Sequence, residues 1–153
     1  MEKTSGRAAK ALNARGLGAV ISSQKRTGAR MMTMDTINRS VAVIKPKQPF
    51  LDWLNALPDN EESFTSADLQ TDCTVLLLPE FGNDLQAHKF IKKIFKYIFE
   101  KELDAYCIDP DYWPRKRGYK TFLKWFDIEL HSEVFDIEDK EIIRGGWVGG
   151  HRI

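Results

Sequence analysis

Two short runs of consecutive apolar residues predict strands. RSVAVIKP at 39–46 is β-branched and closed by a proline, and DCTVLLLPE at 72–80 is also closed by a proline. Because the apolar residues at 39–46 do not alternate with polar ones, we expect both faces of that strand to be covered. FDIELHSEVFDI at 126–137 alternates instead, which is typical of a half-exposed strand on an antiparallel edge.

Three other segments carry apolar residues at helical spacing. In 47–58, Pro49 suits the first turn of a helix. The longest predicted helix covers about 84–104, where Asn83 and Gln86 have the spacing of a capping box. One side of this helix is apolar, and the other carries a narrow row of lysines: Lys89, Lys92, Lys93 and Lys96. A third helix is expected from Pro114 onward.

This order of elements predicts a small α+β fold with a mainly antiparallel sheet of about three strands, packed by two or three helices. We assign residues 36–140 to one globular domain, because a region of this size buries enough surface for a stable core. We assign residues 1–35 to a disordered basic extension and residues 141–153 to a flexible glycine-rich tail.

Charge is distributed unevenly along the 153 residues, whose formal net charge is only +1. Residues 1–35 hold seven Lys or Arg and two acids, whereas residues 36–153 hold sixteen basic and twenty acidic residues. The basic head also has the Arg-rich, acid-poor composition of a transit peptide. Alternatively, translation starts at one of the methionines just before the first strand, Met31, Met32 or Met34. We favour a disordered or non-native extension over a nucleic-acid-binding arm.

Cysteine usage and hydropathy exclude several classes of protein. Cys73 and Cys107 stand far apart, with no CxxC motif and no nearby histidine pair, so zinc binding and a disulfide framework are not indicated. Their apolar neighbours predict buried free thiols in a reducing compartment. No apolar run approaches the roughly 18 residues of a membrane span. The sequence therefore predicts a cytoplasmic protein without a membrane partner.

The segment DYWPRKRGYK at 111–120 combines aromatic and basic residues. We expect Asp111 to cap a helix that begins at Pro114, so that the basic tripeptide lies in its first turn and Gly118 lies inside it. A positive charge at that end of a helix costs about 0.3–1 kcal/mol, and an interior glycine costs roughly 1 kcal/mol. One explanation for this cost is a binding site for an anion or an acidic partner. The other is an internal cluster of salt bridges.

The same segment supplies the candidate binding residues. Trp113 precedes a proline and is flanked by charged residues, so we expect it to be partly exposed. An exposed tryptophan beside arginine is the composition of a protein-interface hot spot, and also of a stacking platform for single-stranded nucleic acid. The candidates are Trp113, Arg115, Lys116, Arg117 and Lys120.

Glu129, His131 and Glu133 alternate on one face of the predicted strand, roughly 7 Å apart. Two carboxylates beside an imidazole are candidates for acid–base catalysis, or for metal binding with a further ligand such as His88. No HExxH, GxSxG, P-loop or GxGxxG motif accompanies them. The alternative is a solvated sheet face whose charges pair with lysines, and we therefore assign no catalytic residue, no metal and no cofactor.

INRSVAVIKPKQPFLDWLNALPD at 37–59, together with WPRKRGYKTFLKWFDIELHSEVFD at 113–136, resembles a group of small bacterial proteins of unassigned function. The resemblance covers most of residues 37–136. It implies a single compact domain in a bacterial cytoplasm, and it carries over no activity and no catalytic residue.

Three hypotheses about function follow. The leading one is a non-catalytic interaction or regulatory domain that binds an acidic protein surface or a small anion through the Trp-Pro-Arg-Lys-Arg patch. The second is an RNA or single-stranded DNA binding protein that uses the same patch, the lysine row and the basic head. The third is a small enzyme that uses Glu129, His131 and Glu133. The sequence does not determine the oligomeric state.

Overall fold

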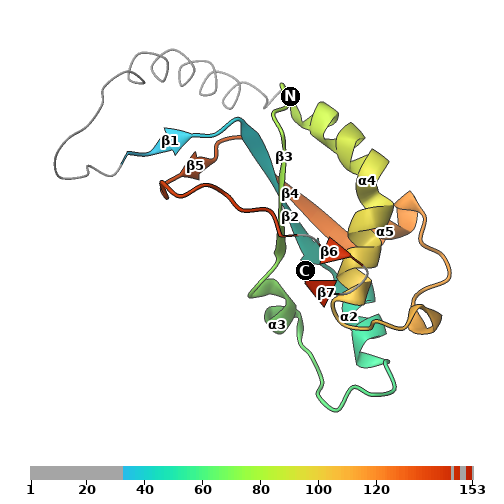
Figure 1. Cartoon of the computed structure of the whole chain (residues 1–153). Helices are drawn as coiled ribbons and strands as arrows, with labels where there is room; N and C mark the ends of the chain where they lie inside the picture. Colours follow the sequence, from blue (N-terminus) through green and yellow to red (C-terminus); the bar gives the residue numbers. More distant parts are fainter. Residues whose placement is uncertain (1–32, 146, 149–150, 153) are drawn as a thin grey trace.

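The computed structural model describes residues 33–145, 147–148 and 151–152, and over these the chain is a small α+β protein (Figure 1). Its main sheet has three antiparallel strands in the order β3-β2-β4. In chain order the elements are β1 (Asp35–Thr36), β2 (Arg39–Pro46), α2 (Gln48–Asn55), α3 (Ser66–Gln70), β3 (Thr74–Pro79), α4 (Asp84–Asp104), η2 (Pro110–Tyr112), α5 (Tyr119–Trp125), β4 (Phe126–His131), β5 (Phe135–Asp136), β6 (Trp147–Val148) and β7 (His151–Arg152). The predicted fold class is confirmed.

One face of the sheet carries the core. Helices α2, α4 and α5 lie on the same side of the strands in Figure 1, and their apolar side chains pack against the inward-facing residues of β2, β3 and β4. The largest fully buried side chains are Phe50, Phe99, Phe122, Phe126, Ile44, Ile91, Ile98 and Leu103. Burying one such side chain stabilises the folded state by about 1.5–3 kcal/mol. The packing of these helices on one face of the sheet therefore stabilises the fold.

The other face of the sheet is more open, contrary to the expectation for β2. Residues of β2 alternate between buried and half-buried, so only one face of the central strand is fully covered. On the neighbouring β3, Val75 is 58% exposed and Leu77 is 49% exposed. Val75 pairs with Val43 and Leu77 pairs with Val41, so these side chains form an apolar strip on the open face.

Helix α4 spans the predicted range and begins as predicted. The Asn83 side chain accepts a hydrogen bond from the backbone N–H of Gln86 at 3.0 Å. The Gln86 side chain accepts from the Gly82 N–H at 3.0 Å instead of from Asn83, so the capping box is only half formed. Pro49 lies in the first turn of α2, as predicted. In α3, Thr65 and Asp68 form a complete capping box.

Strand β4 is shorter than the segment at 126–137 predicts. It pairs only with β2, at the edge of the sheet, and its residues alternate between covered and exposed over 126–131, which confirms the predicted half-exposed edge strand. The chain then leaves the sheet, and β5 pairs with β1 in a separate two-stranded ribbon. Glu133 falls in the connection between β4 and β5 and is not a strand residue.

The expectation of a helix from Pro114 is wrong, because α5 begins only at Tyr119. The short helix η2 ends at Tyr112, and its C-cap residue Trp113 has an extended backbone with a φ of −75° and a ψ of 153°. This conformation follows from the proline that comes next. Gly118 is the N-cap of α5, again with an extended backbone, and does not lie inside the helix. The basic tripeptide 115–117 therefore lies in a loop, and the cost predicted for charges in a first helical turn does not arise.

Other predictions fall on the chain ends. The basic extension over 1–35 and the alternative start methionines Met31 and Met32 lie almost wholly outside the described residues, and the tail over 141–153 is described only in part. Among the described residues, no helix is both long enough and apolar enough to cross a membrane.

Candidate functional site

The loop that carries the basic tripeptide is held to the body of the protein by two tryptophans. The indole N–H of Trp53 in α2 donates to the carbonyl oxygen of Tyr112 at 2.9 Å. The indole N–H of Trp113 donates to the carbonyl oxygen of Cys107 at 2.7 Å. The Asp109 side chain caps η2 by accepting from the Asp111 N–H, so Asp111 is not the cap that the sequence suggested. These contacts fix where the loop starts.

Trp113 is half-buried and packs against the core, which confirms that it is only partly exposed. The guanidinium of Arg117 lies over its ring, with the Cζ atom 5.7 Å from the ring centroid. This is the geometry of a cation–π contact. The indole N–H donates to Cys107 and the guanidinium of Arg117 lies over the ring, so Trp113 holds the loop in place.

Arg117 is the most constrained cation of the loop. Its Nη1 atom donates to the carbonyl oxygen of Pro114 at 2.8 Å. Its Nη2 atom lies 4.0 Å from Oε1 of Glu100 on α4, and its side chain is 33% exposed. Together with the contact to Trp113, these interactions hold the guanidinium in one place while one third of the side chain stays in contact with solvent.

Arg115 and Lys116 differ from Arg117. Both side chains are exposed, and within the described part of the chain neither takes part in an ion pair or a side-chain hydrogen bond. The nearby aspartates Asp109 and Asp111 form no ion pair with them within the same residues. An internal salt-bridge cluster therefore accounts for Arg117 but not for Arg115 and Lys116.

A shallow depression connects this loop to the lysine row of α4. It has a volume of about 180 Å³ and is lined by Lys96, Glu100, Arg115 and Arg117. The other lysines of the row lie on the same exposed side of the helix. We use the name basic surface for this set of exposed or partly exposed cations: Lys89, Lys92, Lys93, Lys96, Arg115, Lys116 and Arg117.

The nucleic-acid hypothesis combines the lysine row with the patch, and the structure brings Lys96 of the row next to the loop although the two are separated in the chain. Aromatic packing joins α4 to α5: the rings of Phe95 and Tyr119 have their centroids 5.3 Å apart, and Lys92 lies over the Tyr119 ring at 5.4 Å. Lys120 is exposed on α5 but is not among the residues that line the depression.

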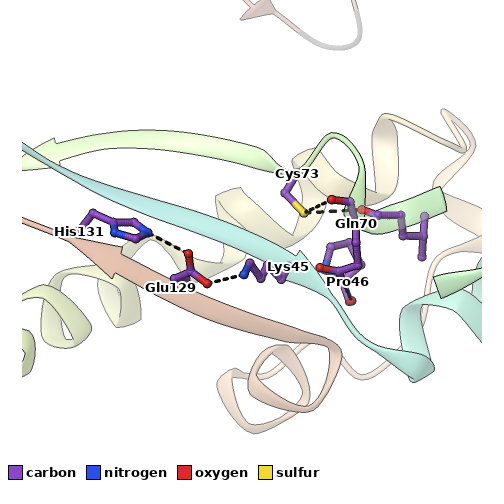
Figure 2. Close-up of polar contacts among 7 residues, drawn as sticks. Lys45, Pro46, Gln70, Cys73, Glu129 and His131 are labelled. Atoms are coloured by element: carbon purple, nitrogen blue, oxygen red, sulfur yellow. Dashed lines mark hydrogen bonds and ion pairs between the residues drawn. The ribbon is translucent and has the colours of Figure 1, made fainter. Parts of the chain in front are cut away.

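Figure 2 shows the second candidate site, on the open face of the sheet. Glu129 accepts a hydrogen bond from Lys45 and lies 2.8 Å from Nε2 of His131. These two contacts lower the pKa of Glu129, the lysine contact more strongly, and the contact with Glu129 raises the pKa of Lys45. The side chains of Glu129 and His131 are 45% and 50% exposed.

This arrangement resembles a row of paired surface charges more than a catalytic site. Glu133, outside the strand, does not join Glu129 and His131. His88, the further ligand that a metal site would require, is an exposed residue of α4. In the described ranges, no three His, Cys, Asp or Glu residues are grouped so that they would hold a metal ion. The structure thus brings together two of the three predicted residues and pairs them with Lys45.

The two cysteines are free, as predicted, but each is half-buried instead of buried. The Cys73 thiol donates to the carbonyl oxygen of Leu69 at 3.6 Å, near the row of Figure 2. Desolvation raises the pKa of Cys73, and the neighbouring Lys45 opposes this effect. A thiol with a raised pKa is a poor nucleophile.

Glu102 was missed by the sequence reasoning. It lies on α4 and is only 5% exposed, and its Oε1 atom has no hydrogen-bond partner. Burial raises its pKa, while a hydrogen bond with the Thr74 side chain and the charge of Lys101 act in the opposite direction. A signal was present, because on a helical wheel Glu102 falls between Ile98 and Phe95, within the apolar side of the helix.

Comparison with known proteins adds no relative to this description. No protein-family model matches the chain, and neither the curated proteins nor the solved structures contain a significant match. The resemblance to small bacterial proteins therefore stays a prediction, and the site has to be interpreted from its own geometry.

Proposed function

We propose that this protein is a non-catalytic interaction domain that binds an acidic segment of another protein through the basic surface. The domain would present its cations from a fixed scaffold, namely α4 and the loop at 113–118. The proposal includes a reducing, cytoplasmic setting, which the two free cysteines fit.

The observation that carries the proposal is the exposure of Arg115 and Lys116 without an intramolecular ion pair, beside the fixed Arg117. Folding gains little from two adjacent cations that contact no acid within the described residues. An arriving carboxylate, in contrast, would gain charge-assisted hydrogen bonds, which are stronger than bonds between neutral groups. Arginine is also a residue type that is enriched at interface hot spots.

The contacts of Trp113 favour the hypothesis of a protein partner over that of a single-stranded nucleic acid. A stacking platform needs an aromatic face that is free to receive a base. Arg117 lies over the Trp113 ring, and the indole N–H is bonded to Cys107. The sequence from 36 onward is also acidic in balance, which does not favour binding along a nucleic acid.

The test is the binding of a short fluorescein-labelled glutamate-rich peptide, measured by fluorescence anisotropy for the full chain. We expect micromolar binding that weakens with salt. The double substitution Arg115→Ala with Lys116→Ala should weaken binding at least about tenfold, since each lost cation contributes roughly 0.7 kcal/mol or more. It should leave the melting temperature unchanged.

The matched control is Lys140→Ala with Arg144→Ala, which removes one lysine and one arginine from exposed positions outside the basic surface. This control should lower affinity by less than about twofold. Equal losses in the two double variants would show that only net charge matters, and the proposal would then be wrong. A labelled single-stranded DNA that binds more tightly than the peptide would favour the nucleic-acid hypothesis instead.

A further inference from the structure

Glu100 is the acidic residue among the four that line the depression of the basic surface. Its side chain is 51% exposed, and it follows Lys96 by one helical turn on α4. A carboxylate among three cations of a binding surface weakens that surface for any anionic partner.

The contact between Glu100 and Arg117 is a loose one. The distance of 4.0 Å between Oε1 and Nη2 is beyond hydrogen-bonding range, so Glu100 supplies charge to Arg117 but no hydrogen bond. Arg117 keeps its position through other contacts, the hydrogen bond to Pro114 and the packing on Trp113. A guanidinium has five N–H donors, so Arg117 can still accept a carboxylate from outside.

We propose that Glu100 is an internal competitor for the acidic partner, and that a carboxylate of the partner takes its place beside Arg117. This inference rests on the proposed function and adds to it a residue that sets affinity. Because the guanidinium is already fixed, the exchange requires only that the half-exposed Glu100 side chain turns away into solvent. Glu100 would thus keep the basic surface weakly binding until a partner with a well-placed carboxylate arrives.

The experiment is a double-mutant cycle on Glu100 and Arg117, read with the same labelled glutamate-rich peptide. Glu100→Gln should tighten binding about fivefold, which corresponds to about 1 kcal/mol for two unit charges near 4 Å in water. In an Arg117→Gln background the same substitution should change affinity by less than about twofold. The control Glu62→Gln removes an exposed carboxylate outside the basic surface and should change affinity by less than about twofold.

A gain of equal size in both backgrounds would mean that Glu100 acts only through its charge at a distance, and the inference would be overturned. No gain at all would overturn it as well. If Arg117→Gln does not fold, the side-chain Nε–H resonance of Arg117 replaces the cycle: it should shift on peptide addition, and an unchanged resonance overturns the inference.

The two proposals fail in different ways. If the wild-type chain does not bind the peptide, or if binding survives the loss of Arg115 and Lys116, the proposed function itself is wrong. If those two results hold and Glu100→Gln changes nothing, the binding surface stands and only the role of Glu100 is wrong.

Discussion

Replacement of the buried Glu102 by glutamine should stabilise the protein. The side chain is 5% exposed, its Oε1 atom has no hydrogen-bond partner, and burial raises its pKa. When Glu102 ionises, this unpartnered atom belongs to a buried charge, and a buried polar atom without a partner costs about 1–3 kcal/mol. Glutamine has the shape of the protonated acid and cannot ionise. We therefore expect a gain of about 1–2 kcal/mol near pH 8.

The gain must depend on pH in a definite direction. An unfolded glutamate titrates near pH 4.3. Below that value Glu102 is protonated in both states, and the variant and the wild type should have about equal stability. Because the pKa of the folded state is raised, the unfolded chain ionises first as the pH increases, and the stability of the wild type falls until the folded protein ionises as well. The advantage of Glu102→Gln should therefore grow from about pH 4 upward and level off above the folded pKa.

The other groups around Glu102 do not reverse the direction of this pH dependence. Thr74 and Lys101 favour the ionised form, and their effects are smaller than that of burial. Cys73 and Tyr106 are also near, and the pKa of Tyr106 is raised first by burial and then by the charge of Glu102. Removal of that charge should lower the pKa of Tyr106, which ultraviolet titration measures.

Urea unfolding at about pH 4 and about pH 8 measures the free energy of unfolding of both proteins. Each kcal/mol should also raise the melting temperature by about 4 °C for a domain of this size. Glu100→Gln on the same helix is the control, and because its carboxylate is half exposed the change should be below about 0.5 kcal/mol. A stability gain that is the same at both pH values, or a loss at both, would refute the reasoning.

Three further predictions concern the scaffold and the open face. Phe99→Ala should cost about 3–5 kcal/mol in urea unfolding, because its ring is fully buried and packs against three aromatic rings, whereas Leu123→Ala at a 40% exposed position should cost less than about 1 kcal/mol. Asn83→Ala removes the cap of α4 and should lower stability by about 1 kcal/mol, with no change if the cap bond is absent in solution. Lys45→Met should raise the pKa of Glu129 toward its ordinary value, which an NMR titration of the side-chain carboxyl follows; an unmoved pKa would show that the pair does not form.

Much of the fold follows from the periodicity of the sequence. The run at 39–46 has the same bounds as β2, and α4 occupies the range that its apolar stripe and Asn83 predict. These elements bury a continuous apolar run or stripe, so the pattern records their environment directly. The alternation over 126–131 likewise identified β4 as an edge strand.

The start of α5 was not predictable from the same signals. Aromatic residues at helical spacing after Pro114 suggested a longer helix, but Arg117 donates its Nη1 proton to the Pro114 carbonyl oxygen and the chain stays in a loop until Gly118. The same guanidinium also lies over the Trp113 ring, a contact outside any helix. A loop conformation that is set by the contacts of one side chain produces no periodic pattern in the sequence.

The candidate site was predictable in its residue types but not in its geometry. The sequence identified Trp113 as partly exposed and the tripeptide as unusual, although the reason it gave, a cost in the first helical turn, was wrong. The contribution of Lys96 and Glu100 requires that α4 and the loop lie together, which only packing determines. The run of leucines also did not predict that Val75 and Leu77 of β3 are exposed, because exposure too is determined by packing.

The most direct test of the basic surface is an NMR titration of the isotope-labelled full chain with the glutamate-rich peptide. We predict that the largest shifts in amide and side-chain resonances occur at Arg115, Lys116 and Arg117, with smaller ones at Lys96, and that all of them diminish with added salt. If the largest shifts instead occur on the open sheet face, around Val75 and its neighbours, or if no resonance of the loop moves, the basic surface is not the binding site.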